Sequence, residues 1–148
     1  MELDAGAQSW AGNNQPEMKI VLKSFLPGCI AFILATILFC LPGNEFPKQN
    51  WLAKIHFDKW VHVCLFALLV TLWCLPFISK KKGTSITRII FITIALLFTL
   101  YGVSIEFIQA EFIPFRSFGI DDMVADAIGC GIGYMFSKWQ LTRFNHIA

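Results

Sequence analysis

The chain has 148 residues, enough for one domain, and 56% of them are hydrophobic while only 15% are charged. Its formal net charge of +2 is too small for a nucleic-acid-binding surface, and no basic stripe alternates with aromatic residues. The charged residues fall between long apolar runs or at their ends, a pattern typical of membrane spans separated by loops.

The cysteines give no sign of a disulfide framework or a metal knuckle. All of them lie inside apolar segments, with no paired CxxC spacing and no histidine at zinc-finger spacing. We interpret them as small core residues. They are Cys29, Cys40, Cys64, Cys74 and Cys130.

The N-terminal region divides into a polar part and an apolar part. Residues 1–17 are polar and aperiodic, and Met18 opens a segment typical of the start of a bacterial membrane protein. We interpret 1–17 as a tail or an incorrectly assigned start, and 18–148 as one transmembrane domain. Residues 25–41 are uncharged and, with the apolar residues before them, long enough to cross a bilayer. A secretory signal is the alternative, but the residues before a plausible cleavage site are bulky.

Three further apolar segments predict spans at about 60–79, 86–109 and 120–139. The last is only weakly apolar, because three aspartates lie in its first two turns. The sequence therefore predicts an all-α protein, a four-span transmembrane helical bundle.

Basic residues give the expected orientation of these spans. The loop at 80–88 is the most basic in the chain, so the positive-inside rule places it and both termini in the cytoplasm, with the protein in the inner (cytoplasmic) membrane. The loops at 42–59 and 110–120 then lie outside, although lysines in the first of them reduce the contrast.

This topology gathers the ionisable side chains at the outer ends of three spans. They are Asp58, Lys59 and His62 in the second span and its approach, Glu106 and Gln109 in the third, Arg116 in the next loop, and Asp121, Asp122 and Asp126 in the fourth. A charge at the bilayer centre costs about 2.5 to 3.5 kcal/mol on insertion scales, so His62, Glu106 and Asp126 are expected to face inward and pair. Gly129 and Gly133 continue the Asp126 face and would let another helix approach closely.

The same residues carry a family resemblance. In order and spacing, the chain resembles the VanZ-like membrane protein family over about residues 58–133, half of its length. The resemblance implies a small multi-span protein of poorly defined biochemistry. The namesake is associated with teicoplanin resistance, which is not carried over because nothing in the chain specifies an antibiotic. The motifs are Asp58-Lys59-x-x-His62, Glu106-x-x-Gln109, Arg116 and Asp122-x-x-Ala125-Asp126-x-x-Gly129, where the family more often has asparagine at the position of Asp126.

Our leading interpretation is an outer-leaflet polar pocket that recognises an amphiphilic, phosphorylated envelope lipid or lipid-linked cell-wall intermediate. Arginine offers a planar fork that matches phosphate, and imidazole with a carboxylate can handle protons. The ligand-binding candidates are Asp58, Lys59, Gln109 and Arg116, and the catalytic candidates, if chemistry occurs, are His62, Glu106, Asp122 and Asp126.

Two other functions stay open at this point. The chain could be a membrane enzyme that hydrolyses or transfers a group on such a lipid, although no nucleophile motif is evident. It could instead be a structural or interaction subunit, in which His62 only bonds Asp58 or Glu106 to hold helices together.

We favour a hydrogen-bonded charge network over a magnesium or manganese site among the acids and His62, and assign no metal or cofactor. The expected partners are membrane lipids.

Overall fold

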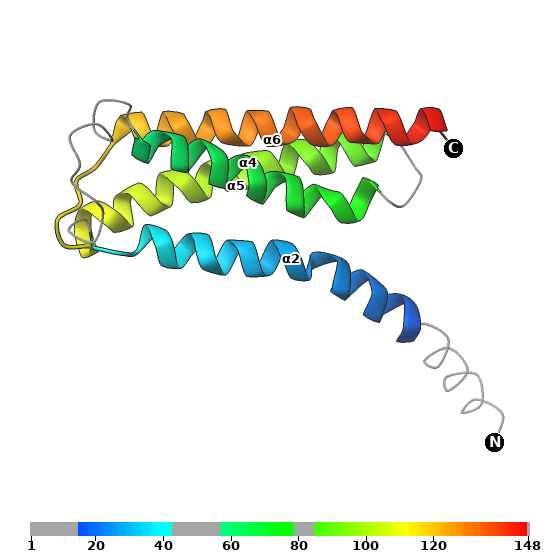
Figure 1. Cartoon of the computed structure of the whole chain (residues 1–148), viewed down its shortest axis with the longest axis horizontal. Helices are drawn as coiled ribbons and strands as arrows, with labels where there is room; N and C mark the ends of the chain where they lie inside the picture. Colours follow the sequence, from blue (N-terminus) through cyan, green and yellow to red (C-terminus); the bar gives the residue numbers. More distant parts are fainter. Residues whose placement is uncertain (1–14, 43–56, 79–84, 148) are drawn as a thin grey trace, which may run out of the picture.

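The computed structural model describes residues 15–42, 57–78 and 85–147. These residues form four α-helices and no β-strand: α2 (Gln15–Phe39), α4 (Phe57–Ile78), α5 (Ser85–Phe112) and α6 (Ile120–Ile147). The helices lie alongside one another in a bundle (Figure 1). The predicted all-α architecture of four helices is confirmed.

The helices extend beyond several of the predicted span boundaries. α6 continues to Ile147, well past the predicted end at 139, and α2 begins at Gln15 within the expected tail. The reason is that hydropathy marks only the apolar part of a helix, whereas its backbone hydrogen bonds continue through polar residues. Residues 1–14 of the tail and most of the loops at 42–59 and 80–88 lie outside the described residues.

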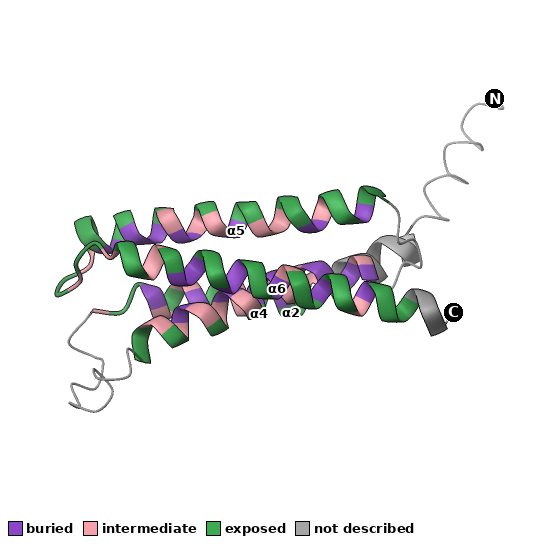
Figure 2. Ribbon diagram, turned by 90° about the horizontal axis from the view of Figure 1, so that it is seen from above, coloured by how far each residue is buried: buried purple, intermediate pink, exposed green. Residues whose placement is uncertain are grey.

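The outer surface of the bundle is apolar. α4 and α5 are long and apolar enough to cross a membrane by length and composition, while the apolar part of α2, residues 23–39, is shorter. α6 has 28 residues, a length of about 42 Å, but its first turns are acidic. Exposed residues run along the outward helix faces (Figure 2), and large apolar side chains such as Leu34, Leu96 and Leu100 are more than half exposed there. So much exposed apolar surface is expected of a protein in contact with lipid.

Two glycines of α6 allow it to pack closely on α4. A Cβ atom added at Gly129 would lie 2.5 Å from the carbonyl oxygen of Val63, and one added at Gly133 would lie 2.6 Å from that of Ala67. Neither carbonyl can move without displacing the helix that contains it. The close approach predicted from these small residues is therefore confirmed.

α2 is held to the bundle by two polar contacts and a row of aromatic rings. Gln109 donates from Nε2 to the carbonyl oxygen of Phe39 at 2.8 Å, and the hydroxyls of Thr36 and Tyr101 are hydrogen-bonded at 2.8 Å. The Phe39 ring packs on Phe66 with centroids 5.7 Å apart, and Phe66 packs on Tyr101 at 6.0 Å. The end of α2 is thus attached to both α4 and α5.

We expect Gly133→Ala to destabilise the bundle by about 1 to 3 kcal/mol, because the new methyl group must push α4 away from α6. Thermal unfolding in detergent would measure the loss. Gly131→Ala is the matched control, since an added Cβ at Gly131 meets nothing within 4 Å. Equal unfolding temperatures for the two variants would contradict the packing described above.

Candidate functional site

The beginnings of α4 and α6 and the end of α5 meet at one end of the bundle (Figure 1). A short loop at 113–119 makes this possible by reversing the chain between α5 and α6. Within the loop, Phe115 has a positive φ of 61°, and the Arg116 amide donates to the Ile113 carbonyl at 3.3 Å. This tight turn keeps the end of α5 beside the start of α6.

A histidine–carboxylate pair joins α4 to α6 inside the bundle. His62 Nδ1 lies 2.8 Å from Asp126 Oδ1, and the two residues are only 4% and 0% exposed. Both residues lie on the helix faces that are in contact at the glycines. Phe66 follows His62 by one turn, Gly129 follows Asp126 by one turn, and a Cβ atom added at Gly129 would lie 2.9 Å from the Cβ of Phe66. The register of the two helices therefore places the imidazole against the carboxylate.

Glu106 of α5 completes a buried group of three ionisable side chains. It is 0% exposed, and its Oε2 atom accepts a hydrogen bond of 3.1 Å from the backbone amide of Gly119. One ligand-type atom from each of His62, Glu106 and Asp126 lies within 4.8 Å of the others. We call these three residues the buried triad.

Each carboxylate of the buried triad has one satisfied and one unsatisfied oxygen. Glu106 Oε1 and Asp126 Oδ2 are buried and have no hydrogen-bond partner among the described residues. Asp126 Oδ2 lies against Gly102 of α5, where an added Cβ would be only 2.5 Å away. Leaving buried polar atoms unpaired is costly, so these two oxygens call for a proton, a water molecule or a ligand.

Lys59 forms the outer edge of the site. Its Nζ atom lies 3.1 Å from Asp122 Oδ1 and 3.5 Å from Asp121 Oδ2. The side chain of Asp121 is 79% exposed, so this part of the network is hydrated and its contribution to stability is below about 1 kcal/mol. These ion pairs join the first turn of α4 to the first turn of α6.

The remaining predicted site residues lie around this centre in different settings. Asp58 is exposed in the first turn of α4, and His62 pairs with Asp126 instead of with Asp58. The Gln109 amide is buried and holds the end of α2. Arg116 is half-buried in the loop between α5 and α6.

Some residues important for this geometry were not predicted from the sequence. Gly119 orients Glu106 through its amide, while its carbonyl accepts hydrogen bonds from Asp122 and Met123 at the start of α6. Its position just before a helix was a usable signal. Phe39 of α2 packs on the His62 ring with centroids 4.8 Å apart, and no sequence pattern pointed to that contact.

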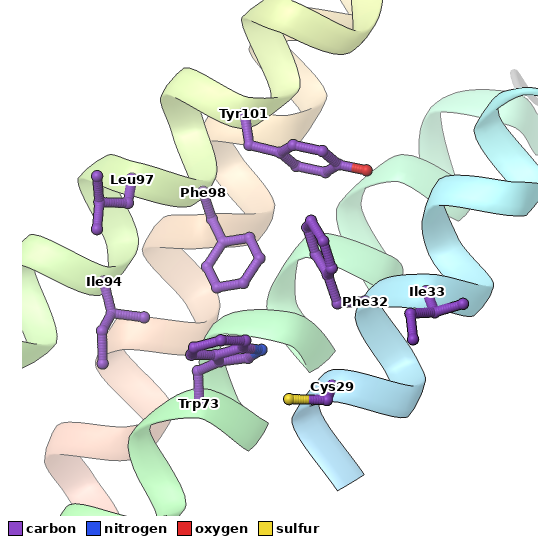
Figure 3. Close-up of a pocket in the computed structure, with 8 residues that line it drawn as sticks. All are labelled: Cys29, Phe32, Ile33, Trp73, Ile94, Leu97, Phe98 and Tyr101. Atoms are coloured by element: carbon purple, nitrogen blue, oxygen red, sulfur yellow. The ribbon is translucent and has the colours of Figure 1, made fainter. Parts of the chain in front are cut away.

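An apolar cavity of about 460 Å³ lies between α2, α4 and α5 (Figure 3). Phe32, Trp73 and Tyr101 are among the side chains that line it, one from each of the three helices. Tyr101 directly precedes Gly102, which faces Asp126. The cavity and the buried triad are therefore neighbours along α5.

A helical bundle with an apolar outer surface and buried charges at one end is that of a small membrane protein. A family model described as VanZ/LLP1 matches residues 8–141, and the chain belongs to this family. The match is longer than the resemblance found at 58–133 and includes α2, α4, α5 and the part of α6 up to residue 141. Comparisons with curated proteins and with solved structures found no match.

We expect the His62–Asp126 pair to show energetic coupling in a double-mutant cycle. His62→Ala and Asp126→Ala should each destabilise the protein by about 1 to 3 kcal/mol, since each leaves a buried polar atom without its partner. The double variant should lose less stability than the sum of the two single losses, with a coupling energy of about 0.5 to 3 kcal/mol. Reversible unfolding in mixed micelles would measure all three.

Asp121→Ala is the control for this cycle, because its side chain is exposed on the same helix. It should change stability by less than about 0.5 kcal/mol and show no coupling to His62→Ala. Strict additivity of the His62 and Asp126 losses would show that the pair has no energetic role.

Proposed function

We propose that this VanZ/LLP1 family member recognises an amphiphilic, phosphorylated envelope lipid, with a lipid-linked cell-wall intermediate as the best fit. One observation carries the proposal: a buried charged group and an apolar cavity lie next to each other, joined at Tyr101 and Gly102 of α5. An amphiphile needs both environments within the length of one molecule.

The cavity suits the apolar part of such a lipid. Its volume of about 460 Å³ lies within the range of roughly 300 to 1,000 Å³ typical of ligand pockets. Its walls are largely aromatic and aliphatic, with Leu97 and Phe98 on α5 at one side and Ile33 on α2 at the other (Figure 3). An acyl or prenyl chain would fill this space and make dispersion contacts with these side chains.

Different polar side chains would contact different parts of the lipid headgroup. A phosphate would be repelled by the carboxylates of Glu106 and Asp126, so it belongs at Lys59 and Arg116 on the edge of the site. Lys59 would exchange its pairing with aspartates for the phosphate, and arginine can bind two phosphate oxygens at once. The buried triad would then face the hydroxyl, amide or amine groups of the headgroup.

The proposal also assigns a side of the membrane. The end of α4 and the start of α5 lie at the opposite end of the bundle from the buried triad (Figure 1), and the basic segment at 80–88 connects them. With basic residues inside, all four helices cross the inner membrane, both termini are cytoplasmic, and the buried triad lies under the outer headgroups.

Reporter fusions test this orientation. A fluorescent protein fused after Ala148 should fold and fluoresce in a bacterial host, because that terminus is cytoplasmic, and alkaline phosphatase at the same position should be inactive. The phosphatase inserted at residue 48, in the loop before α4, should be active. The reverse pattern at either position would place the buried triad on the cytoplasmic side.

Binding of a polyprenyl phosphate tests the ligand class. Purified full-length protein should bind it in micelles, as measured by native mass spectrometry, and should bind the neutral polyprenol of equal length at least about tenfold more weakly, because the alcohol lacks the charge-assisted hydrogen bonds. The Arg116→Ala variant should also bind the polyprenyl phosphate about tenfold more weakly than the wild type does. Arg143→Ala is the matched control, since Arg143 is exposed near the far end of α6.

A second pair of variants tests the cavity. Ile33→Trp should fill the space and weaken binding of the polyprenyl phosphate, whereas Ile37→Trp changes an exposed residue one turn further along α2 that does not line the cavity. Equal binding of the polyprenyl phosphate by wild type, Arg116→Ala and Ile33→Trp would contradict lipid recognition. The charged residues would then serve only to hold the helices of an interaction subunit together.

The His62–Asp126 geometry favours an enzyme as the second candidate function. A carboxylate 2.8 Å from an imidazole nitrogen is the arrangement that orients a general base. Ser104 and Ser137 donate to backbone carbonyls of their own helices. A hydrolase of this kind would activate water. Phosphate or alcohol released from the bound lipid, and lost in a folded His62→Ala variant, would identify it.

A further inference from the structure

We infer that the buried triad of His62, Glu106 and Asp126 binds one divalent transition-metal ion. These residues come from α4, α5 and α6, and an imidazole nitrogen and two carboxylate oxygens lie within 4.8 Å of one another. The inference goes beyond lipid recognition and stands without it, because it rests only on the geometry and satisfaction of these three side chains.

The distances are close to those of a coordinated ion. Ligand bonds of about 2.0 to 2.2 Å to nitrogen and oxygen place neighbouring ligand atoms roughly 3 to 3.5 Å apart. His62 Nδ1 and Asp126 Oδ1 are already 2.8 Å apart, so an ion would replace the proton that they share. The largest distance between two ligand atoms of the triad, at most 4.8 Å, would have to shorten by little more than about 1 Å, and rotation of the side chains can provide this.

The unsatisfied oxygens provide a second, independent observation. Glu106 Oε1 and Asp126 Oδ2 belong to residues that are 0% exposed, and neither has a hydrogen-bond partner in the described part of the chain. The other oxygen of Glu106 is fixed by the Gly119 amide. A carboxylate held by one oxygen and open at the other is the usual state of a metal ligand with an outer-shell partner.

The charge of the triad agrees with a small cation. The Asp126 carboxylate can pack against α5 because residue 102 is glycine, where an added Cβ would collide with it. Two carboxylates and a neutral imidazole carry a charge of minus two, which a divalent ion balances within the apolar bundle. Lys59 contributes little to this balance, because it is paired with Asp121 and Asp122.

The donor set indicates which ions fit. Magnesium and calcium prefer sites made of oxygen alone, whereas imidazole suits the first-row transition ions. One nitrogen and two carboxylate oxygens therefore favour manganese, iron or zinc. Three protein ligands leave at least one coordination position open, as at sites that also bind a water or a ligand oxygen.

Metal loading of the purified full-length protein tests the inference. After treatment with a chelator and equilibration with Zn²⁺ or Mn²⁺ in micelles, elemental analysis should find about one ion per chain, with Mg²⁺ failing to compete at equal concentration. Glu106→Gln and Asp126→Asn, which keep the shape of each side chain, should weaken binding at least about tenfold. The matched controls Glu111→Gln and Asp121→Asn change exposed acids on the same two helices and should bind normally.

A spectroscopic measurement on the wild type keeps the test decisive if a variant does not fold. Bound Mn²⁺ should show electron spin echo modulation from one imidazole nitrogen, and His62→Gln should remove it. Three results would overturn the inference: no ion retained by the wild type, manganese bound without nitrogen coupling, or wild-type affinity in folded Glu106→Gln. The polyprenyl phosphate measurement, which depends on Arg116 and Ile33, would be unaffected by such a failure.

Discussion

The close approach of α6 to α4 at Gly129 and Gly133 is the contact on which the rest of the structure depends. In lipid, helices gain little from burying apolar surface against one another, so packing of small residues and polar contacts must hold them together. The glycines let the two backbones come near enough for His62 to reach Asp126 at 2.8 Å. A wider spacing would leave each of these groups buried without the other.

The loop between α5 and α6 extends this pair into a three-helix site. Its last residue, Gly119, donates to Glu106 and at the same time accepts the first hydrogen bonds of α6. The position of the Glu106 carboxylate is therefore tied to the start of the helix that carries Asp126. α5 also connects the site to the apolar cavity, since Tyr101 and Gly102 are consecutive residues that face the two environments.

Burying two acids and a histidine inside an apolar bundle costs free energy that helix packing alone does not require. The structure recovers part of it through the imidazole and the Gly119 amide, yet one oxygen of each acid stays unsatisfied among the described residues. Groups held in this way at a helical end beside a cavity are typical of a functional site. Lipid recognition and metal binding are both ways of using such groups, and the phosphate contacts proposed for Lys59 and Arg116 lie outside the buried triad proposed to hold the metal.

The sequence by itself determined that the described residues form four α-helices, because long apolar runs interrupted by polar segments allow little else in a membrane. It also indicated that His62, Glu106 and Asp126 face inward, since charges cannot be left in lipid, and that Gly129 and Gly133 form a contact face. Helix ends were placed less well, as α6 shows, because hydropathy does not mark where a helix stops.

Only the tertiary structure decided which of these groups pair. His62 had Asp58 one turn away on its own helix, yet it bonds Asp126, because helix register and the glycine contact set that distance. The attachment of Gln109 to α2, the Phe39 ring on His62 and the cavity beside Tyr101 likewise depend on how α2 docks. Periodicity tells which face of a helix is buried, but the partner of that face depends on distances between segments far apart in the chain.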